Sequence, residues 1–388
     1  MSVNNNISKS LKTLLILLLI VAGGSVVGIA YSRITDTLFL AVAIIYLFFF
    51  CSGIIKNINA VKMWAVLFLF YIVNFVIFST DSPNMTAYIV YVMRMTACML
   101  FCNIFTMDEF KHYFHRAIFA ISVISLIAFV VIMNINYRQY LIYMNDLPMF
   151  GIFNCKAIPT GRNSSVFWEP GAYQIFINLA LLFHFEEKNF SKESLFSFET
   201  LVLVVSLVTT FSTSGYFAFA VVMAFYIVKN WNNMETRTKI LTLIPTLILI
   251  GAVVYIILSS NAVVDKFQVR NTSYIRRQAD LYNSIEALKA SPLHGYGIGT
   301  NSFYYMIENH NLFSNSIGVF ASSLNLGIIY VALFLAGLLY RGLKEYKNIL
   351  IPYIAIILIT AVTEDFFRYS IYFVLLFGFS YITGKDEL

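Results

Sequence analysis

Residues Ser273–Asn311 read SYIRRQADLYNSIEALKASPLHGYGIGTNSFYYMIENHN and form the longest polar interruption in an otherwise apolar chain. The segment holds two adjacent arginines, a helix-like run, a proline, a glycine cluster and a histidine. Apolar runs long enough to cross a bilayer lie on both sides of it. The sequence therefore predicts a polar loop held between membrane spans.

Composition indicates an integral membrane protein. The 388 residues are 59% hydrophobic and 12% charged, whereas a soluble domain carries roughly 25% charged residues. We count about twelve apolar runs near the length that crosses the hydrocarbon core. They are residues 13–30, 38–55, 63–79, 85–106, 117–134, 171–185, 199–213, 215–228, 240–258, 311–340, 349–364 and 369–383. The expected fold class is all-α: one polytopic membrane domain, residues 1–388, with two long loops, 135–170 and 259–310, carrying short helices.

The distribution of positive charge predicts the orientation of these spans. With the N-terminus in the cytoplasm, most of the 26 lysines and arginines fall in cytoplasmic segments, and short external turns hold few. The two long loops are cationic and external, where translocation depends little on charge. Both termini are then cytoplasmic. The net charge of +6 is modest, and we expect no nucleic-acid partner.

Two apolar stretches could each be read as one membrane span or as two. Residues 199–228 are short for two spans, and Thr213-Ser214-Gly215 is the turn signal that splits them. Residues 311–340 are assigned to a single span. The four cysteines do not form a disulfide framework.

The first long loop ends in GRNSSVFWEPG, residues 161–171. Glu169 precedes Pro170 at the start of an expected span, so it can act as a helix cap, favoured by the helix dipole. The alternative is a carboxylate held at the membrane edge beside Arg162, which orients a sugar or accepts a proton.

The second long loop carries an expected surface helix over residues 274–290. Leu281, Ile285 and Leu288 follow helical spacing and are expected to pack downward. Arg276 and Arg277 are a solvated charge pair, a contact with lipid headgroups, or a clamp for a phosphate or diphosphate. A guanidinium group can donate two hydrogen bonds at once to such a ligand.

Further along this loop, the cluster Gly295, Gly297 and Gly299 predicts a sharp turn that lets the backbone pass close to neighbouring spans. It does not follow a strand, so it does not fit a dinucleotide fingerprint. His310 lies at the mouth of the next apolar run, where it is either structural or catalytic. We find no metal-ligand spacing.

Two further charged positions lie outside the long loops. Arg94 falls within the fourth expected span, where a charge must face an ion-pair partner, a backbone carbonyl, a cavity or a ligand. We keep it as a secondary candidate for a lipid diphosphate. Glu364, Asp365 and Arg368 crowd one external turn and either neutralise one another or border the same cavity.

Three segments resemble a known family. GRNSSVFWEPG, TFSTSGYFAF (residues 210–219), and SPLHGYGIGTNSF (residues 291–303) followed by HNLFSNSIGVFASSLNLG (residues 310–327) look like the O-antigen polymerase and O-antigen ligase superfamily, bacterial membrane glycosyltransferases of the GT-C type. Arg277 fits the family's arginine spacing to Pro292, His310-Asn311 matches its His-Asn pair, and Arg162 with Glu169-Pro170 matches its Arg…Glu-Pro element.

The resemblance implies glycosyl transfer at the periplasmic face of the bacterial inner membrane. An undecaprenyl-diphosphate-linked glycan is the implied donor, and the lipid diphosphate leaves without a metal or other cofactor. Arg277, Arg276 and Arg162, with Arg94 as the secondary candidate, are expected to bind the diphosphate. His310 is the expected base, with Glu169 its rival or orienting partner. Membrane lipids are expected partners, and whether a chain-length regulator binds is open.

Three functions remain as alternatives. The Glu-Pro element favours a polymerase that joins lipid-linked repeats, but Trp168 and Ala172 depart from the family's usual context. A ligase that moves finished polymer onto lipid A core uses the same chemistry. A transporter of polysaccharide or lipid-linked glycan predicts inverted repeats and charges at midplane. We find no convincing repeat in the sequence, and the charges cluster outside the membrane rather than at midplane.

Overall fold

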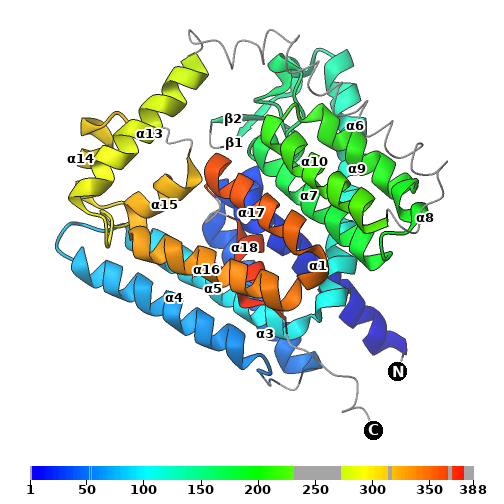
Figure 1. Ribbon diagram of the computed structural model, residues 1–388, viewed down its shortest axis with the longest axis horizontal. Helices are drawn as coiled ribbons and strands as arrows, with labels where there is room; N and C mark the ends of the chain where they lie inside the picture. The colour runs from blue at the N-terminus through cyan, green and yellow to red at the C-terminus, as the bar shows by residue number, and fades with distance from the viewer. Residues whose placement is uncertain are drawn as a thin grey trace. The chain divides into compact units, whose positions relative to one another are not determined.

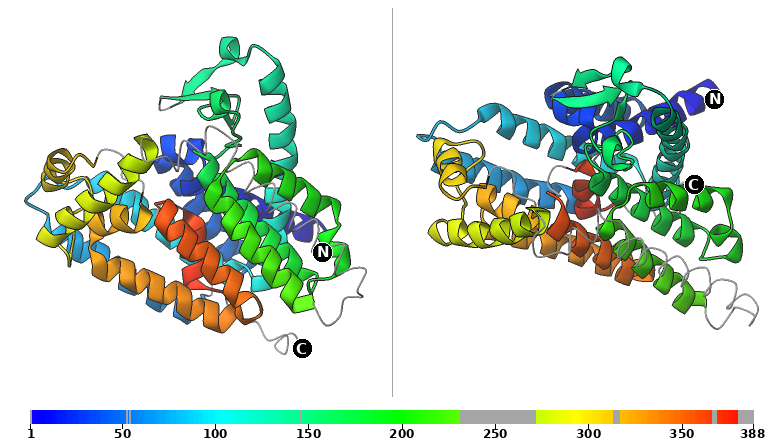
Figure 2. Two further views of the ribbon diagram at one scale, coloured as in Figure 1. Left: turned by 45° about the horizontal axis from the view of Figure 1, so that its top comes forward. Right: turned by 90° about the horizontal axis from the view of Figure 1, so that it is seen from above.

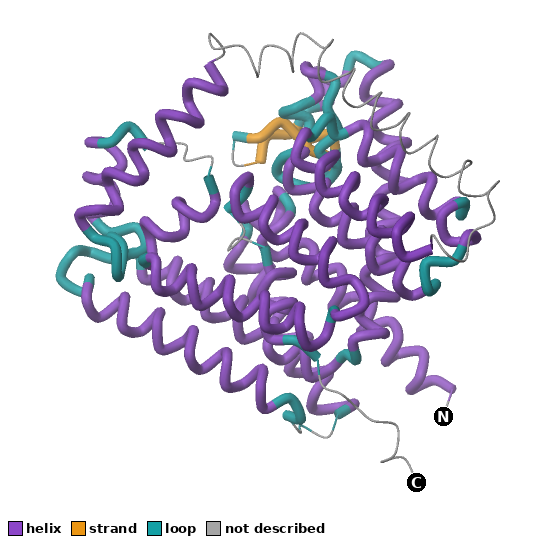
Figure 3. Tube along the Cα trace, in the orientation of Figure 1, coloured by secondary structure: helices purple, strands orange, loops and turns teal. Residues whose placement is uncertain are grey.

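The computed structural model describes residues 2–51, 53, 55–144, 146–230, 272–312, 317–365 and 369–379, without the side chains of residues 2–5 and 272–277. The described chain is mostly helical (Figure 3). It divides into two compact units. Unit 1 is Met1–Ala117, Leu281–Tyr346 and Asp365–Leu388, and unit 2 is Ile118–Asp280 and Lys347–Glu364.

The elements are labelled in Figure 1. Unit 1 contains α1 (Ser2–Gly24), α2 (Val26–Ala30), α3 (Ser32–Phe50), α4 (Ile58–Ile77), α5 (Met85–Ile104), α14 (Asn301–Asn309), α15 (Gly318–Leu326), α16 (Ile328–Glu345) and α18 (Ser370–Phe377). Unit 2 contains α7 (Pro170–Glu187), α8 (Lys192–Leu195), α9 (Phe198–Thr209), α10 (Thr213–Asn230), α17 (Leu350–Thr363), three strands and the 3-10 turns Tyr137–Tyr140, Ile158–Thr160 and Lys347–Ile349. Helices α6 (Met107–Asn134) and α13 (Thr272–Ala290) contribute to both units.

Five described helices are long and apolar enough to cross a membrane: Asn6–Gly24, Ser32–Phe50, Ile58–Ile77, Met85–Ile104 and Met107–Asn134. A sixth is added if α16 and the segment Lys347–Thr363, which pass this test only as a pair, count as one span. Helix α9 has 12 residues, which is short for a span. The expected span at 240–258 lies outside the described residues, so twelve spans remains a prediction.

The structure confirms one of the two predictions about where apolar stretches divide and contradicts the other. The split within residues 199–228 is confirmed, since α9 ends at Thr209 and α10 begins at Thr213. The single span expected over 311–340 is wrong, because Gly327 separates α15 from α16. Gly327 adopts φ 87° and ψ 164°, a region of backbone space open essentially only to glycine. A helix cannot continue through that conformation.

The loop at 135–170 departs from the all-α expectation. Strands β1 (Ile142–Met144), β2 (Leu147–Phe150) and β3 (Phe153–Asn154) form an antiparallel sheet in that order. Ile142 pairs with Met149, and Phe150 pairs with Phe153. Asp146 and Gly151 take positive φ in the two connections, as two-residue hairpin turns require. Such short strands carry too little alternation to be distinguished from a loop in the sequence.

The sheet is fastened to the end of α6 by a small apolar cluster. Buried Ile132, Cys155 and Ile158 form its centre, and Phe129 and Phe150 pack against it. Figure 2, left, shows the chain running from α6 into this sheet. Burial raises the pKa of the Cys155 thiol, so this cysteine serves as a packing residue rather than a reactive one.

The glycine cluster of unit 1 behaves as predicted. Gly295, Gly297 and Gly299 all have positive φ. A Cβ at Gly295 would lie 2.7 Å from the carbonyl oxygen of Leu324, and one at Gly299 would lie 2.7 Å from Cβ of Asn84. The backbone N–H of Tyr296 donates to the Leu324 carbonyl at 2.8 Å. Close approach of two backbones is therefore the physical reason for these glycines.

The packed face predicted for α13 is only partly right. Leu288 is buried, but Leu281 and Ile285 are 41% and 40% exposed. Asp280, Ser284 and Ala287 are buried instead. Ala287 and Leu288 join Met306, Leu312 and Leu324 in one apolar cluster, which ties the Leu281–Ala290 part of α13 to α14 and α15. Small side chains mark the contact face because they allow the helices to approach closely.

The turn between α4 and α5 holds the start of α14. The backbone N–H of Ser302 donates to Oδ2 of Asp81 at 2.9 Å, and the N–H of Asn301 donates to the Asp81 carbonyl at 3.1 Å. Hydrogen bonds from the side chain and backbone of Ser302 hold the pKa of Asp81 below its ordinary value. A carboxylate beside a helix N-terminus is stabilising.

Asp81→Ala should speed hydrogen exchange of the Ser302 amide at the start of α14, because that N–H loses its side-chain acceptor. Since the folded-state pKa is lowered, the carboxylate's contribution is present above about pH 4 and is lost as pH falls through the lowered pKa. The hydrogen-exchange rates of the variant and the wild type, each corrected for the intrinsic exchange rate, should therefore become more similar as the pH is lowered. The control is Glu308→Ala, an exposed carboxylate of the same helix. Equal effects of the two substitutions would refute the assignment.

Candidate functional site

Within unit 2, contacts with strand β3 and helix α7 hold the segment GRNSSVFWEPG in place. Buried Asn154 of β3 donates to the carbonyls of Phe167 and Trp168 at 3.0 and 2.7 Å. Phe167 is fully buried, and its ring stacks on Tyr173 of α7 with centroids 5.2 Å apart. The sheet that the sequence did not reveal therefore holds the backbone that leads into Glu169.

Glu169 is the residue that precedes helix α7. Its backbone is extended, with φ −155° and ψ 163°, and Pro170 occupies the first helical position, where proline is well tolerated. The carboxylate makes no capping hydrogen bond to the helix. Of the two alternatives for Glu169, the side-chain cap is thus not the one adopted, and the half-buried carboxylate lines a pocket instead.

Arg162 is positioned by contacts with the end of α9. Its Nε donates to the carbonyl of Thr210 at 3.1 Å. The neighbouring Asn163 donates from its backbone N–H to the carbonyl of Thr209 at 2.8 Å and from its side chain to the Thr209 hydroxyl at 3.1 Å. These bonds bring the start of GRNSSVFWEPG against the turn that begins TFSTSGYFAF.

One pocket of unit 2 gathers these elements. It has a volume of about 600 Å³, in the range of small-molecule sites. Its polar wall comes from the 162–171 segment and the α9–α10 turn, and its apolar wall from α17. The lining residues are Arg162, Glu169, Gly171, Ser212, Thr213, Ser214, Phe217, Leu358, Ile359, Val362, Thr363 and Glu364. Two segments quoted for the family resemblance therefore meet here.

Glu364 adds a second carboxylate to this pocket. A Cβ placed on Gly171 would overlap Oε1 of Glu364 and would lie 3.8 Å from the carboxyl carbon of Glu169. The two carboxyl groups thus lie near the same backbone position, and a larger residue at Gly171 would displace the Glu364 carboxylate. Glu364 is the C-cap of α17, and because its carboxylate lies beside Gly171 in the first turn of α7, the positive end of the α7 dipole favours its negative charge.

The other predicted site residues lie elsewhere in the chain. His310 is the C-cap of α14, and its carbonyl accepts a hydrogen bond from the Asn283 amide of α13 at 2.7 Å. Arg276 and Arg277 are helical residues of α13, and their side chains lie outside the described residues, as does Arg368. Asp365 accepts a hydrogen bond from the Ser322 hydroxyl at 3.0 Å.

Arg94 forms an ion pair with Asp36, which is one of the alternatives that the sequence left open for it. Its Nε and Nη2 donate to the two carboxylate oxygens of Asp36 at 2.9 and 2.8 Å. Both residues are buried in unit 1, with exposed fractions of 5% and 0%. A bidentate pair of this kind accounts for a charge at membrane depth without a ligand.

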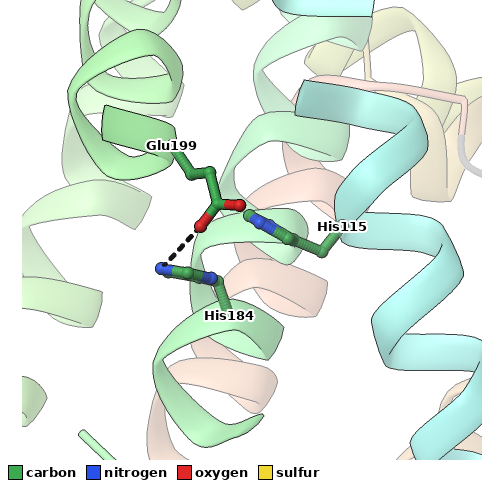
Figure 4. Close-up of side chains that lie close together, drawn as sticks. All are labelled: His115, His184 and Glu199. Atoms are coloured by element: carbon green, nitrogen blue, oxygen red, sulfur yellow. Dashed lines mark ion pairs between the residues drawn. The ribbon is translucent and has the colours of Figure 1, made fainter. Parts of the chain in front are cut away.

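A histidine–carboxylate contact also lies in unit 2, apart from the pocket residues. Nε2 of His184 is 3.8 Å from Oε2 of Glu199 (Figure 4) and 3.2 Å from the hydroxyl of Ser197. His184 lies in the last turn of α7, Ser197 is the N-cap of α9, and Glu199 lies in the first turn of α9. The contact therefore joins two helix ends, and the sequence had assigned His184 no role.

Sequence reasoning did not select several pocket residues. Glu364 was recognised only as a possible neighbour of a cavity. Ser212 was quoted only within TFSTSGYFAF, and Thr213 and Ser214 only there and as part of a turn. Gly171 was quoted only as the last residue of the GRNSSVFWEPG segment. The signal that could have found Gly171 is its place directly after Glu-Pro in the first turn of a helix, where glycine has no local conformational purpose.

Taken together, the described residues are mostly helical and include five apolar helices, or up to six, that are able to span a membrane. Its candidate site is a polar pocket of unit 2 with one arginine and two carboxylates. No family model, curated protein or solved structure matches this chain.

Proposed function

We propose that this protein is an O-antigen polymerase of the bacterial inner membrane. It joins undecaprenyl-diphosphate-linked oligosaccharide repeats at the periplasmic face, with both termini in the cytoplasm. The observation that carries the proposal is the shared pocket of Arg162, Glu169 and Glu364. A cation for a leaving diphosphate and a carboxylate for an attacking hydroxyl are the groups that this reaction needs.

In the proposed reaction, an acceptor hydroxyl attacks the anomeric carbon of the donor. The bond between that carbon and the diphosphate oxygen breaks, and the lipid diphosphate leaves with the electron pair. Arg162 donates hydrogen bonds to the charge that develops on the leaving group. Arg276 and Arg277 add positive charge. Arg94, the secondary candidate from the sequence, is paired with Asp36 within unit 1 and is not assigned to this pocket. Because arginines stabilise the negative charge on the leaving diphosphate, the reaction as proposed uses no metal ion.

The proton of the acceptor hydroxyl requires a base. Glu169 and His310 are the two groups proposed for it. Glu169 is the stronger choice, because it lines the same pocket as Arg162 and its carboxylate is not used as a cap. Glu364, held beside Gly171, provides acceptor oxygens that can orient sugar hydroxyls.

The test uses purified protein in lipid nanodiscs with lipid-linked repeats and no nucleotide sugar. Wild type should form long polymer. Glu169→Gln should lower the rate at least about 100-fold, as loss of a general base does, and Arg162→Ala should lower it by about the same factor through lost charge stabilisation. His310→Ala tests the rival base in the same assay.

The matched control is Arg138→Ala, which removes an exposed arginine of the same loop and should leave the rate unchanged. Polymer formation by Glu169→Gln and Arg162→Ala at the wild-type rate would overturn the proposed site. Transfer of preformed polymer to lipid A core, without joining of repeats, would identify a ligase. Movement of glycan across the membrane without bond formation would identify a transporter.

A further inference from the structure

Unit 1 contains a separate cavity at one end of two spanning helices. Its volume is about 350 Å³. Residues at the beginnings of α3 and α5 line it, so these two helices point the same way and start at the same end. The lining residues are Gly23, Ile29, Ser32, Arg33, Asn84, Thr86, Ala87, Val90, Tyr91 and Arg94. A cavity at the ends of two spans lies at headgroup depth, whichever side of the membrane that end faces.

The cavity is elongated along one face of α5. Asn84, Ala87, Tyr91 and Arg94 follow the i, i+3, i+7 and i+10 spacing that keeps side chains on one helix face. With a rise of 1.5 Å per residue, the lining extends roughly 15 Å along the helix from its beginning. The cavity therefore leads from the end of the span towards its interior.

Positive charge is present at both ends of this cavity. Arg33 is exposed at the start of α3. Arg94 is buried at the deep end, where its bidentate bond to Asp36 holds the guanidinium in place. Asp36 neutralises one of the two arginines, so a net positive charge remains. The hydroxyls of Ser32, Thr86 and Tyr91 and the amide of Asn84 provide further polar groups.

The surface beside the cavity mouth is apolar. Ile34, next to Arg33, is 60% exposed, and Met85 and Ile89 of α5 are 60% and 49% exposed. Exposed aliphatic side chains on spanning helices are positions where acyl chains lie. A ligand that fits both features has an anionic head for the cavity and hydrocarbon for the surroundings.

We propose that this cavity binds the phosphate headgroup of a membrane lipid. Arg33 contacts the phosphate at the mouth, and the polar face of α5 receives the remainder of the headgroup. The inference does not depend on the proposed polymerase activity, because the cavity lies within unit 1 and the candidate active-site pocket lies within unit 2.

The test measures binding of phosphatidylglycerol to the full chain purified in a neutral detergent, with native mass spectrometry to count retained lipids. Arg33→Gln should weaken binding of the tightest lipid about tenfold, as expected for one charge-assisted contact at a partly exposed position. Ala87→Phe, which fills the cavity without changing charge, should weaken it as well. Arg138→Gln is the matched control, an exposed arginine outside this cavity, and should bind like wild type.

Competitors identify the source of the phosphate. Undecaprenyl phosphate and phosphatidylglycerol should both displace the bound lipid, whereas phosphatidylcholine and inorganic phosphate should not. Equal competition by inorganic phosphate would overturn the assignment to a lipid. Identical affinities of wild type, Arg33→Gln and Ala87→Phe would show that the retained lipid is bound elsewhere, and would also overturn the proposal.

Discussion

Asp36→Ala should lower the free energy of unfolding by about 3–5 kcal/mol, the range measured when one partner of a buried ion pair is removed. The substitution takes away the carboxylate that binds Arg94 through two hydrogen bonds at 2.9 and 2.8 Å. Arg94 is 5% exposed and cannot regain a full hydration shell. The measurement is unfolding in mixed micelles followed by circular dichroism.

The double variant Asp36→Leu with Arg94→Met should recover most of this loss, because a buried ion pair can be replaced by apolar side chains at little net change. Asp108→Ala, which removes an exposed carboxylate in the first turn of α6, should cost no more than about 1 kcal/mol. If Asp36→Ala were no more destabilising than Asp108→Ala, the ion pair would not hold the α3–α5 contact together.

Gly327→Ala should have a comparable effect through the backbone. A Cβ there would overlap the carbonyl oxygen of Leu293 and would lie 2.7 Å from the N–H nitrogen of His294. Neither backbone group can swing away as a side-chain end can. The conformation at φ 87° and ψ 164° is itself strained for alanine by about 1–3 kcal/mol, and overpacking adds about 1–3 kcal/mol. We therefore expect a loss of about 2–6 kcal/mol in the free energy of unfolding, in the same measurement.

Gly151→Ala is the matched control for this prediction. Gly151 also has positive φ, at 60°, but a Cβ there meets nothing within 4 Å. Only the left-handed conformation is penalised, by roughly 1–2 kcal/mol. Equal losses for the two alanine variants would mean that the contact of Gly327 with residues 292–294 contributes nothing to stability.

Hydropathy predicted several spanning helices closely. The fourth expected span, 85–106, corresponds to Met85–Ile104, and the second and third correspond to Ser32–Phe50 and Ile58–Ile77 with earlier beginnings. Helix ends were less accurate, because polar first-turn residues such as Ser32 and Arg33 carry no apolar signal. The division at Gly327 was missed for a related reason: apolar residues on both sides of a glycine look continuous in a hydropathy window.

Within the candidate site, motif reading selected Arg162 and Glu169, which line one pocket. It did not select Glu364, because nothing local distinguishes a carboxylate at the end of α17 from an ordinary turn residue. It also expected Leu281 and Ile285 to be buried on α13, whereas Asp280, Ser284 and Ala287 are buried. Apolar spacing does not identify the contact face when small residues allow the closer approach.

The amino-acid sequence alone indicated a mostly helical chain with several helices able to cross a membrane, since lipid cannot hydrogen-bond the backbone and a long apolar helix satisfies its own backbone groups. Tertiary structure alone decided which charges meet. Asp36 reaches Arg94, and Glu364 reaches the first turn of α7 beside Glu169, only when distant segments pack together. Such contacts depend on the relative placement of whole helices, and no local run of residues encodes that placement.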